Sequence, residues 1–432
     1  RKQRSARLYA SITVIVLLVA LYGYALAALS LRSPGPRPGD ALDSGLLFVL
    51  LVPALNEERV ISRTLSSLLR LRGNFLVLVI DDASEDGTVA AVRPFLENPR
   101  VRLLRQPPEE ARRGKGHVLN AGVGAIRRMR ISEYFGAENI IVTVFDADAR
   151  VEPGFLDAVA PCFADPRVAG VQSAVRMYNA DANLLTFWQN LEFAIWGRVM
   201  CRAKNLLGSA TLGGNGQCVR LSALEGLGEE PWQAASLTED LDLSLRLLAS
   251  GGGLLRFCPS ATVWQEAVPE LGRLVRQRSR WMQGHLVCWQ HLPRLLRGAL
   301  PLRARLDLAV FLLLPATVLP VGLASLLSWQ QLLSGVGGWS LSGLALTYAI
   351  GFVVAPLAVA YLARVEDRGT LRSLLHGHLF VFYSAVWFLA SVAAWWNILL
   401  GRRGWAKTAR FAAGEEEPGC PAACRSQDKE VL

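Results

Sequence analysis

The feature that most constrains this chain is the presence of long stretches without a charged side chain near both of its ends. No charged residue occurs from Leu8 to Leu31 or from Leu308 to Ala363, and a third such run covers Leu379 to Leu400. A helix needs about 20 apolar residues to cross the hydrocarbon core of a bilayer. The first and third runs each predict one transmembrane helix, and the second predicts two helices that turn near Ser334. A cleaved signal peptide is the alternative for the first run, but that run is long and lacks a small-residue cleavage site.

The distribution of charge favours a membrane surface over a nucleic acid as the partner. The formal net charge is +10, and 52% of the residues are hydrophobic. Basic residues gather beside the apolar runs, at residues 1–7, 294–305 and 402–410, and form no stripe with interleaved aromatic residues. We therefore expect membrane lipids and a nucleotide diphosphate as partners, and no nucleic acid.

Between the apolar runs, the chain alternates between short apolar strands and segments with helical spacing. The predicted strands are Leu46–Val52, Phe75–Ile80, Val101–Leu104 and Ile140–Phe145. This alternation predicts βαβ units, a mostly parallel sheet and an α/β fold class. In such sheets ligands bind at the carboxyl ends of the strands, which is where this chain has its acidic residues.

Acidic residues directly follow three of these strands. Glu57 follows the first strand, and Asp81 and Asp82 close the second. A carboxylate there can accept hydrogen bonds from a ribose or a base, although turns and helix caps favour the same residue types. Asp146 and Asp148 follow the Ile140–Phe145 strand, and two carboxylates so close are costly unless a cation lies between them. Hard oxygen ligands suit Mg²⁺ or Mn²⁺.

Two further segments can place functional groups near those carboxylates. Lys115 lies in a glycine-flanked basic turn and can offer an ammonium to a diphosphate, although the spacing is not that of a nucleotide-triphosphate loop. Gly214 and Asn215 lie in a glycine-rich segment that allows close approach of a sugar to the backbone, or forms an ordinary tight turn.

A predicted helix begins with Glu239 and Asp240, where Asp240 can act as a general base. The alternative is that both residues only occupy a first helical turn, where acidic side chains are favoured. A later basic helical stretch carries Gln277, Arg280 and Trp281. Arginine has the fork geometry that binds phosphate, and tryptophan offers a flat face to a sugar ring, whereas a solvated or lipid-facing basic helix is the alternative.

In this order, the motifs resemble those of processive, membrane-embedded family-2 glycosyltransferases of the cellulose, chitin and poly-N-acetylglucosamine synthase kind. The resemblance covers roughly Leu46 to Trp289 and the apolar helices on both sides. It implies an inverting enzyme with a UDP-sugar donor, a GT-A (Rossmann-like) catalytic domain in the cytosol, and a multi-pass location in the cell membrane. The implied organisation is a transmembrane helix at 8–31, the GT-A domain at 45–268, interfacial helices with the QxxRW motif at 269–303, three transmembrane helices at 306–400 and a polar tail at 401–432.

The resemblance also implies roles for single residues. The donor-binding residues are Glu57, Asp81, Asp82, Lys115, Asp146 and Arg280. The acceptor-binding residues are Gly214, Asn215, Gln277 and Trp281. The metal ligands are Asp146 and Asp148, the base is Asp240, and Glu239 is the next candidate for the base.

The sequence leaves the acceptor open. The presence of Gln277, Arg280 and Trp281 together favours addition of glucose or N-acetylglucosamine to a β-linked polysaccharide. The segment Gly213-Gly214-Asn215-Gly216-Gln217 is closer to bacterial relatives that glucosylate diacylglycerol, so a glycolipid synthase is the alternative. A transporter or scaffold with a non-catalytic nucleotide-binding domain is disfavoured, because the apolar runs lack charges and every motif carboxylate is present.

Overall fold

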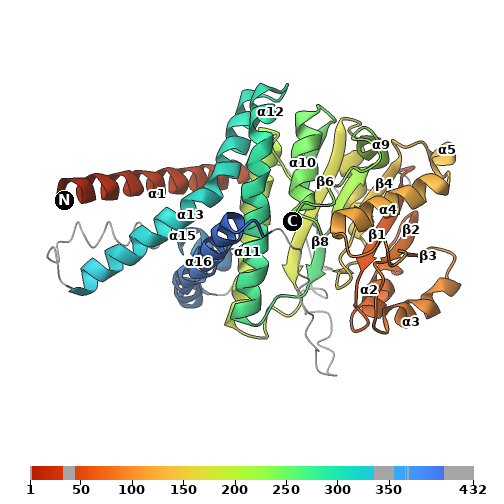
Figure 1. Cartoon of the computed structure of the whole chain (residues 1–432), viewed down its shortest axis with the longest axis horizontal. Helices are drawn as coiled ribbons and strands as arrows, with labels where there is room; N and C mark the ends of the chain where they lie inside the picture. The colour runs from red at the N-terminus through yellow and green to blue at the C-terminus, as the bar shows by residue number, and fades with distance from the viewer. Residues whose placement is uncertain (1, 33–43, 335–354, 365, 367–368, 403–432) are drawn as a thin grey trace.

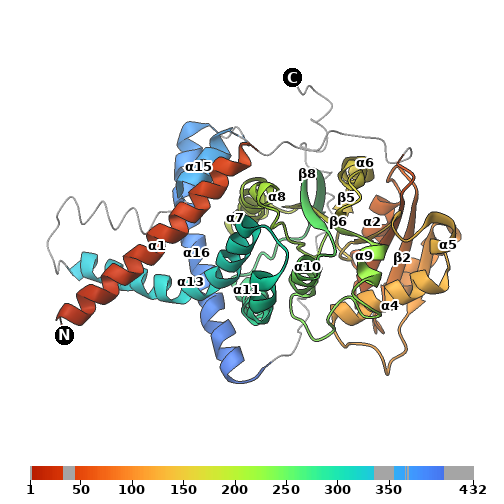
Figure 2. The same ribbon diagram turned by 90° about the horizontal axis from the view of Figure 1, so that it is seen from above.

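The structure, a computed structural model, describes residues 2–32, 44–334, 355–364, 366 and 369–402 (Figure 1). Nearly all of the predicted polar tail, from residue 403 onward, lies outside these residues, as does the predicted turn after Ser334. A sheet with its covering helices forms one side of the molecule, and the long helices α1, α13 and α16 form the other (Figures 1 and 2). Helix α11 stands between the two sides.

The centre of the first side is an eight-stranded sheet with the order β3-β2-β1-β4-β7-β6-β8-β5. Strands β1, β2, β3 and β4 pair in parallel, β7 runs antiparallel to β4 and β6, β6 and β8 are parallel, and β5 is antiparallel to β8. The strands are β1 Leu47–Ala54, β2 Phe75–Asp81, β3 Val101–Arg105, β4 Ile140–Val144, β5 Arg150–Val151, β6 Val168–Met177, β7 Gln217–Arg220 and β8 Leu254–Gln265. The predicted α/β class with a mostly parallel sheet is confirmed.

Helices cover both faces of this sheet and continue into the other side of the molecule. The helices before β6 are α1 Lys2–Ser30, α2 Ile61–Leu68, α3 Thr88–Val92, η1 Arg93–Glu97, α4 Lys115–Arg128, α5 Ser132–Phe135, α6 Phe155–Val159 and η2 Ala160–Phe163. The next are α7 Leu184–Ile195, η3 Trp196–Cys201, α8 Arg202–Leu207, α9 Leu221–Glu225 and α10 Glu239–Ala249. The last are α11 Leu271–Val287, η4 Cys288–His291, α12 Leu292–Arg297, α13 Leu302–Ser334, α15 Ala355–Arg364 and α16 Thr370–Leu399.

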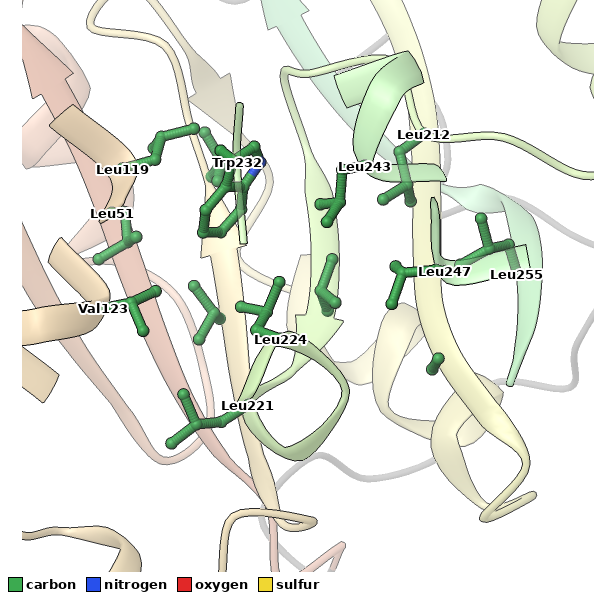
Figure 3. Packing of buried hydrophobic residues seen from close by; sticks show 14 of the residues in the cluster. Leu51, Leu119, Val123, Leu212, Leu221, Leu224, Trp232, Leu243, Leu247 and Leu255 are labelled. Atoms are coloured by element: carbon green, nitrogen blue, oxygen red, sulfur yellow. The ribbon is translucent and has the colours of Figure 1, made fainter. Parts of the chain in front are cut away.

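Strand β1 is buried on both faces because its successive side chains enter two different cores. Phe48, Leu50 and Val52 pack with helices α2 and α6, whereas Val49 and Leu51 pack with α4 and α10. Figure 3 shows the second core, in which side chains of α4 and α10 lie on either side of a buried tryptophan. Burial on both faces explains why the strand reads as a continuous apolar run, and it holds the carboxyl ends of the central strands rigidly in place.

Two of the described helices, within α13 and α16, are long and apolar enough to cross a membrane by length and composition. The α13 segment Leu302–Leu323 has a mean hydropathy of 2.1, and Thr370–Leu399 has one of 1.7. Helix α1 covers the first predicted span and contains a shorter apolar segment, Val14–Ser30. Many of the leucines that the structure describes on these helices are exposed.

Candidate active site

The amino ends of helices α4 and α10 meet the loop that follows β4. The ammonium of Lys115, at the start of α4, lies 2.5 Å from Oδ1 of Asp146 and 3.7 Å from Oε1 of Glu239. The Lys115 side chain is 19% exposed, so this contact is largely shielded from water. Three residues that are far apart in the sequence are therefore brought together at the carboxyl end of the parallel strands.

Asp240 joins this cluster from the first turn of α10. A Cβ added at Gly214 would lie 3.1 Å from Oδ2 of Asp240 and 3.8 Å from the ammonium of Lys115. Gly214 also has a φ of +82°, which favours glycine over residues that carry a side chain. The glycine-rich segment thus brings its backbone close to the cluster. The predicted approach of a sugar to this backbone stays a prediction.

The pKa values of this cluster reflect its burial and its charges. Burial raises the pKa of Asp240 to about 7, and repulsion from Glu239 adds to this effect, while the Leu241 N–H and Lys115 oppose it. Burial lowers the pKa of Lys115, but Asp146 and Glu239 outweigh that effect, so its pKa is raised overall. A carboxyl group that titrates near neutral pH has the property expected of a general base.

Asn215 has side-chain bonds to protein groups on both sides. Its Oδ1 accepts a hydrogen bond from the Asp146 N–H at 3.1 Å, and its Nδ2 donates to Gln265 at 2.9 Å. Nε2 of Gln172 donates to the Asn215 carbonyl at 2.8 Å. These bonds position the loop of Asp146, while the predicted contact of Asn215 with an acceptor stays a prediction.

Asp148 contacts the backbone just after β8. It is buried, and its Oδ2 accepts a hydrogen bond from the Glu266 N–H at 3.1 Å. Among the residues that the structure describes, no group of three or more His, Cys, Asp or Glu side chains is arranged to hold a metal ion. The two carboxylates of Asp146 and Asp148 have the oxygen chemistry that Mg²⁺ or Mn²⁺ prefers, so they fit such an ion when diphosphate and water oxygens supply its other ligands.

The three predicted acidic residues lie at and just beyond the carboxyl ends of β1 and β2. Asp81 accepts hydrogen bonds from the Ser84 N–H at 3.3 Å and from Arg105 at 3.5 Å. Oδ1 of Asp82 accepts one at 2.9 Å from the N–H of Arg112, in the loop that leads into α4 and Lys115. Burial raises the pKa of Asp82 despite this bond. Glu57 is also buried, and its backbone N–H donates a hydrogen bond to the Thr88 hydroxyl oxygen at 2.7 Å.

Helix α11 carries the last group of predicted residues, of which Arg280 interacts with the cluster. Burial lowers the pKa of Arg280, whereas the charges of Glu239, Asp240 and Asp146 act in the opposite direction, which places its guanidinium near that cluster. Its Nη1 also donates to the Leu237 carbonyl at 3.5 Å, just before α10. The following residue, Trp281, is half-buried against α7 through an edge contact with Phe193 at 6.1 Å between ring centroids.

The structure adds supporting residues that the sequence did not predict. Nε2 of His291 lies 2.7 Å from Oδ1 of Asp242, a buried contact that holds the first turns of α10 and so the backbone of Asp240. Arg278, inside the QxxRW motif, donates to Gln277 at 3.3 Å and is itself buried. In the sequence, only the position of Arg278 between Gln277 and Arg280 could have indicated a role for it.

The family is shown by a sequence profile. The profile described as "Glycosyltransferase like family 2" matches residues 45–284, more than half of the chain. The chain belongs to this family. The predicted family-2 membership is therefore confirmed, whereas the finer prediction of a processive polysaccharide synthase is not shown by this match.

Characterised relatives of this family-2 glycosyltransferase include enzymes with lipid products. This chain is 29% identical over 397 residues to a β-monoglucosyldiacylglycerol synthase of Trichormus variabilis. The alignment covers 87% of this chain and 79% of the relative. The corresponding Synechocystis enzyme is 31% identical over 296 residues, or 65% of this chain and 57% of the relative. A poly-β-1,6-N-acetyl-D-glucosamine synthase of Staphylococcus epidermidis is 27% identical over 242 residues, covering 54% of this chain and 53% of that enzyme.

A solved structure supports the predicted GT-A fold. A mannosyltransferase of Pyrobaculum calidifontis, solved in complex with GDP-Man and Mn²⁺, superimposes with a TM-score of 0.61 at 22% identity. The match covers 90% of this chain and 99% of the mannosyltransferase. The likeness therefore extends past the catalytic sheet into the helices that follow it.

Proposed function

We propose that this family-2 glycosyltransferase is an inverting, membrane-bound enzyme that transfers a hexose from a UDP-sugar to a lipid acceptor of the diacylglycerol kind. The observation that carries the lipid acceptor is the similarity to a glucosyldiacylglycerol synthase along 87% of the chain, which is longer than the catalytic domain alone. This favours the glycolipid alternative of the sequence analysis over its first choice, a polysaccharide synthase.

The donor site in this proposal follows the carboxyl ends of the parallel strands. Glu57, Asp81 and Asp82 would contact the nucleoside, since their loops lie next to each other beyond β1 and β2. Lys115 and Arg280 would face the diphosphate from the two sides of the cluster. Lys115 then exchanges part of its contact with Asp146 for contact with phosphate oxygens, where its charge stabilises the departing group.

Asp146 and Asp148 would hold Mg²⁺ or Mn²⁺, which supplies positive charge to the diphosphate. Asn215 accepts a hydrogen bond from the backbone N–H of Asp146, and the Glu266 N–H donates to the carboxylate of Asp148, so this part of the site would be formed before the donor arrives. Such preorganisation lowers the cost of binding the donor in a reactive position.

Asp240 would act as the general base. Its carboxylate takes the proton from the acceptor hydroxyl while the hydroxyl oxygen attacks the anomeric carbon. The bond from that carbon to the diphosphate oxygen breaks on the opposite side, so the configuration inverts and UDP leaves. A pKa of about 7 keeps a large fraction of Asp240 ionised at neutral pH and makes the proton transfer favourable.

In this proposal the acceptor reaches the base from the side of the long helices. Helices α13 and α16 cross the membrane, α11 lies at its surface, and the catalytic sheet faces the cytosol, where UDP-sugars are made. Trp281 on α11 contacts the acceptor, and the helices α11 and α16 pack directly against each other. A lipid could then present its hydroxyl to Asp240 while its chains stay in the bilayer.

A product analysis tests this proposal. The full chain, reconstituted in vesicles that contain diacylglycerol, is given radiolabelled UDP-glucose or UDP-N-acetylglucosamine, and Asp240→Asn serves as the inactive control. Label that enters the organic phase as a monoglycosylated lipid supports a lipid acceptor. Label found only in insoluble or high-mass carbohydrate would overturn the lipid acceptor and favour the second candidate, a polysaccharide synthase. That candidate is supported by the similarity to the Staphylococcus enzyme and by the presence of Gln277, Arg280 and Trp281 together.

A further inference from the structure

A buried charged cluster joins α7, α11 and α16 beside the proposed acceptor site, and no predicted role uses it. Arg278 of α11 is 1% exposed and donates to Oε2 of Glu192 on α7 at 2.7 Å. Two side chains of α16 bind the same carboxylate: the Tyr383 hydroxyl donates to Oε2 and the Trp387 indole N–H donates to Oε1, each at 2.7 Å. One glutamate therefore links a catalytic-domain helix, the helix of the QxxRW motif and a long apolar helix.

Arg278 also stacks on the indole of Trp281. Its guanidinium carbon lies 4.1 Å from the ring centroid, within the range of a cation–π contact. The ring edge of Phe193 contacts the same indole. One face of Trp281 is thus covered by a cation, and the ring plane is set by groups on two helices.

Stability alone gives no reason to keep an arginine at this position. A buried ion pair gains little over apolar residues of similar volume, because both charges must be removed from water. The Nε of Arg278 moreover has no hydrogen-bond partner among the residues described. An arginine whose buried charge gains little over apolar residues, yet whose guanidinium stacks on the predicted acceptor platform, indicates a role in placing that platform.

We infer that Arg278, held by Glu192, is a positioning residue that fixes the plane of Trp281, so that the indole face turned away from Arg278 receives the acceptor. This inference rests on the proposed function only in taking Trp281 as the acceptor contact. Because Tyr383 and Trp387 bind the same glutamate, the position of the platform is tied to α16 and hence to the depth of the protein in the membrane.

A double-mutant cycle tests this inference. The acceptor KM and the donor KM are measured in vesicles for the full chain, for Arg278→Gln, for Trp281→Ala and for the double variant. Arg278→Gln should raise the acceptor KM about tenfold, the order expected for the loss of a desolvated cation–π contact, and leave the donor KM within about twofold. The double variant should be no worse than Trp281→Ala, because residues that act through one contact are not additive. Arg278→Lys keeps the charge without the planar fork and should be intermediate.

A matched control separates positioning from folding. Lys204 on α8 forms an even more deeply buried ion pair with Asp307 on α13, and no contact joins it to Trp281 among the described residues. Lys204→Gln should lower the yield of folded protein without changing the acceptor KM of the folded fraction. Glu192→Gln, which keeps the size of the side chain, should raise the acceptor KM as Arg278→Gln does, and it replaces that variant if the latter fails to fold.

Two results would overturn the inference: additive effects of Arg278→Gln and Trp281→Ala on the acceptor KM, or an unchanged acceptor KM in both Arg278→Gln and Glu192→Gln. The outcome is independent of the acceptor class. If the wild-type protein uses an oligosaccharide and no lipid, the lipid proposal fails, and the same cycle measured with that oligosaccharide still decides the role of Arg278.

Discussion

Replacing Gly214 by alanine should lower kcat because the added methyl group displaces the Asp240 carboxylate, and this effect can be separated from the effect of backbone strain. The added Cβ would lie 3.1 Å from Oδ2 of Asp240, so the carboxylate must move by a few tenths of an ångström. A φ of +82° also costs an alanine about 1 kcal/mol. Since a 1 Å misplacement of a reacting group can cost about 10²-fold in rate, we expect a fall in kcat of about tenfold.

Gly208 provides the matched control. It has a φ of +77°, and a Cβ added there meets nothing within 4 Å. Gly208→Ala should therefore lose a similar free energy of unfolding, about 1 kcal/mol, and keep its kcat. The assay is initial-rate UDP release at saturating donor and acceptor, with thermal unfolding of each purified variant measured in parallel.

Equal kcat values for Gly214→Ala and the wild type would refute the close contact between Gly214 and a catalytic Asp240. Equal losses of kcat in Gly214→Ala and Gly208→Ala would mean that backbone strain alone explains the effect. Only a loss confined to Gly214→Ala supports the geometry in which the glycine-rich segment leaves room for the base.

Three further predictions concern the proposed chemistry. Asp240→Asn should lower kcat by about 10²–10⁴ while donor affinity, measured by calorimetry, changes little; near-normal turnover would leave Asp240 as a helix-terminal residue and make Glu239 the next candidate. Because only ionised Asp240 can accept a proton and its pKa in the free enzyme is raised to about 7, kcat/KM should rise with pH through about 7 and level off above it, and a kcat/KM that is flat from pH 5 to 9 would contradict this. Removal of divalent cations with EDTA should abolish transfer, Mn²⁺ or Mg²⁺ should restore it in the wild type but not in Asp148→Ala, and full activity in metal-free buffer would refute the metal site.

The sequence by itself determined the parallel half of the sheet and the class of the enzyme. The predicted strand Phe75–Ile80 corresponds to β2 at Phe75–Asp81, because an apolar run that ends in acidic residues carries its own local signal. In a parallel sheet, a residue that directly follows such a strand lies at the edge where the carboxyl ends of the strands meet. That is why Asp82 and Asp146 could be assigned to one edge of the sheet before their contacts were known.

Tertiary structure decided the antiparallel part of the sheet and the contacts around the proposed acceptor site. Strand β7 is only Gln217–Arg220, too short to show a period in the sequence, and it is defined by its antiparallel pairing with β4 and β6. Arg278 and Glu192 are 86 residues apart and become partners only where α7, α11 and α16 pack together. Periodicity and motif spacing report local backbone preference and the face of an element, whereas the partner of a buried charge depends on which elements pack against each other, and only the folded chain determines that.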